Sequence, residues 1–143
     1  MIMRIRLIHG PNLNLLGKRN PAIYGTMTLQ ELEQAVVEYG ASKGAEIHPF
    51  QSNDEGELVQ AIHDCASDCH AIVINPGGFS HTSVAIRDAL EAVELPVYEV
   101  HLSNIHARES FRHKSITAEA STACISGMGV QGYCSALDGI LTT

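Results

Sequence analysis

Short apolar runs alternate with amphipathic helical patterns along the chain, and this alternation constrains the fold more than any other feature. The runs typical of strands occupy residues 2–9, 45–50, 71–74, 95–100 and 120–126. Alternating strands and helices predict a parallel sheet with helices on both faces. Five strands in this arrangement favour an α/β, flavodoxin-like doubly wound sandwich with the strand order 2-1-3-4-5.

Caps and apolar stripes locate the helices between these strands. Thr28 followed by Glu31 fits a capping box, and Asn53 or Asp54 can cap a second helix. A third helix is expected to follow residues 75–78 and to end near residue 93, and the last covers 130–141. The residues expected to face the core from the third helix are Val84, Ala85, Leu90 and Val93.

Length and charge limit the class of protein and its partners. A chain of 143 residues is expected to form one domain, residues 1–143, with a core of its own. The net charge of −7 argues against nucleic acid or an anionic membrane as the main partner. The apolar runs are too short to span a bilayer, and the N-terminus enters a strand pattern without a signal peptide, so we predict a cytoplasmic protein.

The cysteines suggest packing rather than a disulfide framework or a metal site. They are Cys65, Cys69, Cys124 and Cys134. His63 and His70 flank the first pair, which raises the possibility of a metal site. However, the two histidines project away from the helical face that the cysteines would share, and no second ligand pair follows. We therefore expect no metal and treat the cysteines as small apolar residues.

The predicted strand order also predicts where a ligand binds. Strands 1, 3 and 4 are neighbours in this order, and ligands of such folds lie beyond the carboxyl ends of the strands at the switch point. The loops that meet there begin at Gly10, Asn75 and His101. They are also the most polar and least periodic segments of the chain, so we place the functional site between them.

The loop after the fourth strand contains an acid–base pair and two arginines. Strand alternation puts Glu99 and His101 on the same side, where the carboxylate would orient the imidazole and favour its protonated form. Arg108 and Arg112 follow at a helical i, i+4 spacing. This group suits a small anionic substrate, although a strand end with solvated charges would show the same pattern.

The first loop, residues 10–27, is long enough to suggest a functional role. Asn12 stands just past the strand, where its amide can hold a water or a carbonyl oxygen. Arg19 and Tyr24 lie on a segment bounded by glycines that could open and close. A free tyrosine, with a pKa near ~10, is a poor base, and a nearby arginine lowers that pKa. Alternatively, this tyrosine only packs in a lid.

The second loop, residues 75–83, places two glycines before a helix N-terminus, which favours an anion. His81 lies at that helix start, and Asp88 lies about two turns further along, which is far for the same ligand. Ser80 beside His81 suggests a nucleophile elbow, but that motif needs glycine where Thr82 stands. A hydrolase triad is therefore disfavoured.

The segment 127–132 matches G-x-G-x-x-G, but no strand with an acidic residue about 20 residues on can follow it before residue 143. These glycines more simply ease close packing of the last helix on the sheet. The chain has no Walker A pattern.

Five segments in this order resemble the type II 3-dehydroquinate dehydratase family from end to end. They are Gly-Pro-Asn-Leu-Asn-Leu-Leu-Gly at 10–17, Arg19…Pro21…Tyr24-Gly25, Asn75-Pro-Gly-Gly78 with His81-Thr-Ser83, the run 99–109, and Gly-x-Gly-x-x-Gly-Tyr at 127–133. The resemblance implies dehydration of 3-dehydroquinate to 3-dehydroshikimate by anti elimination through an enolate, without metal or cofactor. Either the shikimate pathway to aromatic amino acids or quinate use would fit.

The resemblance also implies a role for each matching residue. Tyr24 takes the proton next to the ketone, and Arg19 and Arg108 hold it as phenolate. Asn12 positions a water that stabilises the enolate oxygen. His101, set by Glu99, protonates the departing hydroxyl as general acid.

The remaining matches imply substrate binding. Backbone N–H groups of Leu102 and Ser103, with the hydroxyl of Ser103, take the substrate carboxylate. The residues implied to bind the ring hydroxyls are Asn75, His81 and Arg112. Asp88 comes from a neighbouring subunit, within trimers that pack into a dodecamer. One departure is Asn20, where the family commonly has glutamate, and it affects the expected ordering of the lid.

Two readings from other function classes remain open at this point. One is a cofactor-free hydrolase that uses Ser80 and His81. The other is a flavodoxin-like module that binds an anion without catalysis, because a fold does not fix a function.

Overall fold

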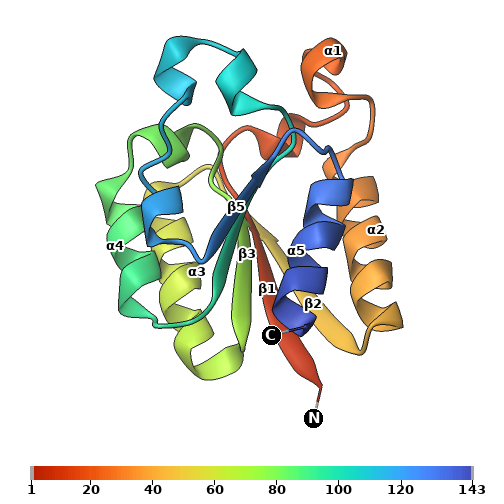
Figure 1. The fold of residues 1–143 in the computed structure, drawn as a ribbon, viewed down its shortest axis with the longest axis vertical. Coiled ribbons are helices and arrows are strands. Elements are labelled where there is room, and N and C mark those ends of the chain that lie inside the picture. The colour runs from red at the N-terminus through yellow and green to blue at the C-terminus, as the bar shows by residue number, and fades with distance from the viewer. Residues whose placement is uncertain (1, 143) are drawn as a thin grey trace.

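The computed structural model describes residues 2–142 and contains a five-stranded sheet in the order β2-β1-β3-β4-β5 (Figure 1). Every neighbouring pair of strands is parallel. The strands are β1 (Met3–His9), β2 (Ala45–Gln51), β3 (Ala71–Asn75), β4 (Val97–His101) and β5 (Ala123–Ser126). The predicted flavodoxin-like order is therefore confirmed.

Helices cover both faces of the sheet. They are α2 (Leu29–Ser42), α3 (Glu55–Asp68), α4 (Val84–Ala92) and α5 (Gln131–Leu141), and the short α1 (Pro21–Tyr24) lies in the first loop, beyond the end of the sheet (Figure 1). Figure 1 shows α2 and α5 on one side of the sheet and α3 and α4 on the other. The outer helices thus divide the apolar residues into two clusters, one on each face.

Strand alternation explains how one strand supplies both clusters. Ile5 and Leu7 of β1 pack with Val36 and Leu137 on the side of α2 and α5. Ile8 points to the opposite side and joins the cluster of α3 and α4. A strand buried on both faces is typical of a parallel sheet.

Side-chain caps fix the starts of the longer helices. Thr28 Oγ1 accepts a hydrogen bond from the Glu31 backbone N–H, and the Glu31 carboxylate accepts one from the Thr28 N–H, which confirms the capping box. Asp54, rather than Asn53, caps α3 by accepting from the N–H of Glu57. Such caps satisfy N–H groups that have no partner within the helix.

The predicted inner face of α4 is partly wrong. Val84 is 59% exposed and Ala85 is also exposed, whereas Ile86, Ala89 and Leu90 are buried. The helix starts at its Ser83 cap, after the 3₁₀ turns of Gly77–His81. Residues 86, 89, 90 and 93 form the i, i+3, i+4, i+7 stripe that packs with the core, and Val84 and Ala85 lie outside that stripe.

Of the glycines near the C-terminus, Gly132 acts as the sequence suggested, whereas a Cβ added at Gly129 would meet nothing within 4 Å. A Cβ atom added at Gly132 would lie 3.3 Å from Cγ1 of Val100 and 3.3 Å from Cγ2 of Ile125. Only glycine lets α5 approach β4 and β5 this closely without displacing those side chains. In the part of the chain that the structure describes, no helix is both long and apolar enough to cross a membrane.

We predict that Gly10→Ala destabilises the protein by about 3 kcal/mol, because overpacking against backbone cannot relax easily. The new Cβ would lie 2.3 Å from the carbonyl oxygen of Pro76. Gly78→Ala is the matched control, since a Cβ there meets nothing within 4 Å. Urea unfolding measures both variants, and equal midpoints for the two would contradict this account of the loop contact.

Candidate active site

A cleft of about 140 Å³ opens at the carboxyl ends of β1, β3 and β4, where the switch-point argument places it. The predicted site residues that line it are Asn12, Arg19, Tyr24, Asn75, His81, His101, Leu102, Ser103, Arg108 and Arg112. The N–H of Gly10 donates to the carbonyl oxygen of Asn75 at 2.8 Å and ties the first loop to the second. Three segments distant in sequence therefore form one site.

Glu99 and His101 form a hydrogen-bonded pair at the end of β4. Glu99 Oε2 lies 2.7 Å from His101 Nε2, and the residues are 0% and 5% exposed. Burial favours a raised pKa for Glu99, but the hydrogen bond and charge of His101, with two hydroxyl groups, hold that pKa below its ordinary value. The carboxylate is thus kept ionised beside the imidazole, and of these two side chains only that of His101 lines the cleft.

Sequence reasoning missed the two hydroxyl groups that complete this carboxylate. Ser115 Oγ donates to Glu99 Oε2 at 2.6 Å, and Thr117 Oγ1 donates to Glu99 Oε1. A serine and a threonine two residues apart in a polar segment carry no signal of such a role. Only the packing of residues 115–117 against β4 reveals it.

Tyr24 lies between two guanidinium groups. The Cζ atoms of Arg19 and Arg108 lie 4.9 Å and 5.1 Å from the centroid of its ring. Arg108 Nη1 also donates to Ser103 Oγ at 3.2 Å, which links the lid to the end of β4. The positive charges that the sequence suggested for this tyrosine are therefore in place.

The helical i, i+4 spacing of Arg108 and Arg112 does not correspond to a continuous helix. Two 3₁₀ turns, Ile105–Ala107 and Ser110–Arg112, are separated by extended backbone at Arg108 and Glu109. Glu109 Oε1 lies 3.6 Å from Nε of Arg108 and 3.2 Å from Nε of Arg112. This carboxylate brings both guanidiniums to one side, so they line the cleft without a helix.

The second loop is organised by Asn75 at the end of β3. Asn75 Nδ2 donates to Tyr133 Oη at 3.3 Å, and its Oδ1 accepts from the N–H of Gly77 at 3.0 Å. Tyr133 ends the last segment of the resemblance, but no role was expected for it. Full burial raises its pKa to about 12, so it stays a neutral partner. The amide of Asn75 is thereby fixed at the wall of the cleft.

His81 lies beside the acid pair. Its ring stacks on that of His101 with centroids 6.5 Å apart, and its Nδ1 lies 2.9 Å from the carbonyl oxygen of Lys114. Ser80 is fully buried, and its hydroxyl donates to the carbonyl oxygen of Gly77. This serine is neither exposed to substrate nor hydrogen-bonded to His81, which rules against the hydrolase alternative.

Two of the predicted site residues do not line the cleft. Glu99 lies behind His101, as its supporting role requires. Asp88 is exposed on α4 and is absent from the walls of the cleft. As the sequence suggested, Asp88 lies too far along the helix to share a ligand with His81 of the same chain.

Two of the candidate ligands considered for a metal site, Cys65 and His70, are occupied in other ways. Cys65 is buried and donates to the Ala61 carbonyl oxygen, and Nδ1 of His70 accepts from the N–H of Arg4. Near the cleft, side-chain atoms of Glu99, His101 and Cys124 lie within 4.8 Å of one another. Hydrogen bonds already occupy the carboxylate of this group, which is the arrangement of an acid pair rather than of a metal centre.

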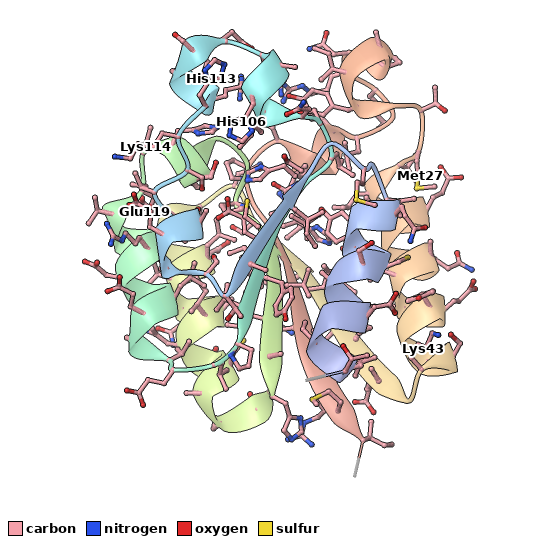
Figure 2. The ribbon with its side chains drawn as sticks, viewed as in Figure 1. Met27, Lys43, His106, His113, Lys114 and Glu119 are labelled. Atoms are coloured by element: carbon pink, nitrogen blue, oxygen red, sulfur yellow. The ribbon has the colours of Figure 1, made fainter. Side chains whose placement is uncertain are left out.

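No lysine is found among the described residues that line the cleft. Figure 2 shows Lys43 near the C-terminal end of α2, at the opposite end of the molecule from the carboxyl ends of the strands. Lys114 contributes its backbone oxygen to His81. The long basic side chains of the cleft are therefore those of Arg19, Arg108 and Arg112, and guanidinium groups do not form Schiff bases.

A doubly wound α/β protein with an acid pair and an arginine-flanked tyrosine in one cleft is equipped for acid–base chemistry on a small anion. A sequence model of the family described as dehydroquinase class II matches residues 3–141. The chain belongs to the dehydroquinase class II family.

Individual relatives agree with this assignment. A catabolic 3-dehydroquinase 2 of Neosartorya fischeri is 53% identical over 134 residues, which cover 94% of this chain and 89% of the relative. A 3-dehydroquinate dehydratase of Halothermothrix orenii is 49% identical over 138 residues, covering 96% and 93%. The crystal structure of a type II dehydroquinase from Propionibacterium acnes matches with a TM-score of 0.95 and 41% identity over 100% of both chains.

The buried Glu99 predicts an acid-dependent contribution to stability. Because its folded pKa is lowered, its contribution is complete above the ordinary value near 4.5 and is lost as pH falls through the folded pKa. The stability difference between the wild type and Glu99→Gln should therefore be constant from about pH 7 to pH 5 and shrink below about pH 4.5.

Urea unfolding at several pH values measures this difference. Glu38→Gln serves as a control, since Glu38 is exposed on α2, where it accepts from Gln34 and does not contact the acid pair. A wild-type advantage over Glu99→Gln that persists unchanged at low pH would show that Glu99 is not ionised in the fold.

Proposed function

We propose that this chain catalyses the dehydration of 3-dehydroquinate to 3-dehydroshikimate and water. The observation that carries the proposal is one cleft that holds both a candidate base, Tyr24 between two guanidiniums, and a candidate acid, His101 on buried Glu99. The printed names of the relatives, a catabolic 3-dehydroquinase and a 3-dehydroquinate dehydratase, support the same reaction. These names fit both the shikimate pathway and quinate catabolism.

Tyr24 is the general base of the proposed reaction. In the proposed step its phenol oxygen, with the guanidiniums of Arg19 and Arg108 beside the ring, removes the proton next to the substrate ketone. The electron pair of the broken C–H bond moves onto the ketone oxygen and gives an enolate. Asn12, which lines the same cleft, holds a water that donates a hydrogen bond to this oxygen.

His101 is the general acid of the second step. As the enolate collapses, the bond from the neighbouring carbon to its hydroxyl group breaks, and His101 gives a proton to the departing oxygen. The products are the conjugated enone and water. Glu99 stabilises the protonated imidazole before this transfer. Side chains supply both acid and base, so this lyase chemistry requires no cofactor.

The remaining residues of the cleft bind the substrate in this proposal. The backbone N–H groups of Leu102 and Ser103, together with the Ser103 hydroxyl, hold the carboxylate. Asn75, His81 and Arg112 contact the ring hydroxyls. Two-point binding of this kind fixes which face of the ring meets the base and which meets the acid, as anti elimination needs.

A direct assay tests the proposed function. The purified protein should convert 3-dehydroquinate to a conjugated enone, which is followed by its ultraviolet absorbance. Substrate binding without any product would instead favour a non-catalytic anion-binding module.

Tyr24→Phe should lower kcat by about 10²–10⁴-fold while substrate binding persists, because the variant loses only the basic oxygen. Tyr39→Phe is the matched control, since that phenol contacts Asp138 on α5 and lies outside the cleft. Steady-state kinetics and calorimetric binding separate the two effects. A Tyr24→Phe enzyme with a near wild-type kcat would overturn the assignment of the base.

The assembly is part of the proposal. Residues 1–143 form a single flavodoxin-like catalytic domain of a cytoplasmic homo-oligomer, built of trimers packed into a dodecamer, and Asp88 serves the site of a neighbouring subunit. The exposure of Asp88 and its distance along α4 support this arrangement. Closed symmetry is the norm for such oligomers.

Subunit complementation tests the role of Asp88. Oligomers of Tyr24→Phe subunits alone, or of Asp88→Ala subunits alone, should not be fully active. Mixed oligomers should regain activity, because some of their sites combine an intact Tyr24 with an intact Asp88 from the neighbouring subunit. Light scattering should give the mass of an oligomer of trimers. A fully active monomer, or mixtures no more active than their parts, would contradict the shared site.

A further inference from the structure

The carboxylate of Glu99 is fully buried and yet saturated with hydrogen-bond donors. Its Oε2 accepts from His101 Nε2 at 2.7 Å and from Ser115 Oγ at 2.6 Å, and its Oε1 accepts from Thr117 Oγ1. A buried carboxylate without partners would take up a proton, whereas two or three donors favour the charged form. The two hydroxyls therefore decide the ionisation of Glu99 together with His101.

The proton of the Ser115 hydroxyl is committed to this carboxylate. Ser115 Oγ accepts a hydrogen bond from the backbone N–H of Ala118 at 3.0 Å, so one of its lone pairs is already in use. A hydroxyl has a single proton to donate, and the charged oxygen Oε2 of Glu99 accepts it at 2.6 Å. The geometry is that of a fixed donor rather than of a freely rotating side chain.

The segment that carries the hydroxyls is itself held in place. The N–H of Ile116 donates to the carbonyl oxygen of Ser80 at 2.8 Å, which attaches the segment to the second loop of the cleft. Thr117 is completely buried, and its carbonyl oxygen accepts from Ser121 Oγ at 3.0 Å. Both hydroxyls are thus presented to Glu99 from a rigid support.

The other groups near Glu99 and His101 do not replace the two hydroxyls as close donors to the carboxylate. Cys124 Sγ, from β5, donates a long, weak hydrogen bond of 3.8 Å to Glu99 Oε2. Desolvation of this thiol and the neighbouring carboxylate raise its pKa to about 11, so it stays neutral. His81 stacks on the far side of His101 and does not reach Glu99. Among the described groups, His101, Ser115 and Thr117 supply the short hydrogen bonds to the carboxylate.

We propose that Ser115 and Thr117 are positioning residues that keep Glu99 ionised and aimed at His101, so that the imidazole keeps its proton for the reaction. Neither hydroxyl lines the cleft or needs to touch the substrate. The consequence for catalysis rests on the proposed function, in which His101 is the general acid. The consequence for Glu99 itself holds without any substrate.

Infrared titration of the resting protein tests the effect on Glu99 directly. The C=O stretch of protonated Glu99 is assigned by its loss in Glu99→Gln. In Thr117→Val, which keeps the shape and removes one donor, this band should appear at a pH about one to two units higher than in the wild type. Thr117→Ser should restore the wild-type titration, because it restores the hydroxyl.

Kinetics supplies the second readout. At pH 7, Thr117→Val should lower kcat about tenfold with KM unchanged, and Thr117→Ser should recover it. Ser121→Ala is the matched control. It also removes a hydroxyl from this part of the chain, but that hydroxyl donates to the Thr117 backbone and does not contact Glu99. It should alter neither the titration nor kcat.

Ser115→Ala gives the same infrared test if Thr117→Val does not fold. An unchanged Glu99 titration in a folded variant that lacks either hydroxyl would overturn the proposal, even if kcat fell, because the effect would then be structural. A shifted titration in a chain that does not dehydrate 3-dehydroquinate would retain the role of the hydroxyls and reject the proposed reaction.

Discussion

The hydrogen bond between buried Glu99 and His101 is the constraint on which the site depends. A carboxylate without solvent access is stable here because its charge is shared with an imidazole and two hydroxyls. This requirement explains why residues 115–117 must pack behind β4 and attach to the second loop. Removing one partner would leave a buried charge unsatisfied, so the arrangement holds only as a whole.

The parallel sheet converts this local pair into a site. Because β1, β3 and β4 are neighbours and run in one direction, their following loops open at the same edge. The close approach of Gly10 to Pro76 joins two of these loops, and the bond from Arg108 to Ser103 supports the third. Strand order places the tyrosine and the histidine in one cleft although they are far apart in sequence.

Much of this could be predicted from local patterns, and the failures have physical causes. Alternation and caps were enough for the strand order and for the helix start at Thr28, because these depend on neighbouring residues. The burial of Val84 was wrong, because the stripe of α4 that packs with the core is residues 86, 89, 90 and 93 and Val84 lies outside it. Thr117 was missed and Tyr133 received no role, because each supports a site residue from a distant segment and only tertiary packing shows it.

The central claim is that side-chain acid and base, rather than a covalent amine, carry out the dehydration. A lysine mechanism would form a Schiff base with the substrate ketone, which borohydride reduces to a stable adduct. The most direct test is intact-mass spectrometry after treatment with borohydride and 3-dehydroquinate together. The account predicts an unchanged mass and full activity, because no lysine is found among the described residues of the cleft. An adduct on Lys18, Lys43 or Lys114 with loss of activity would contradict it.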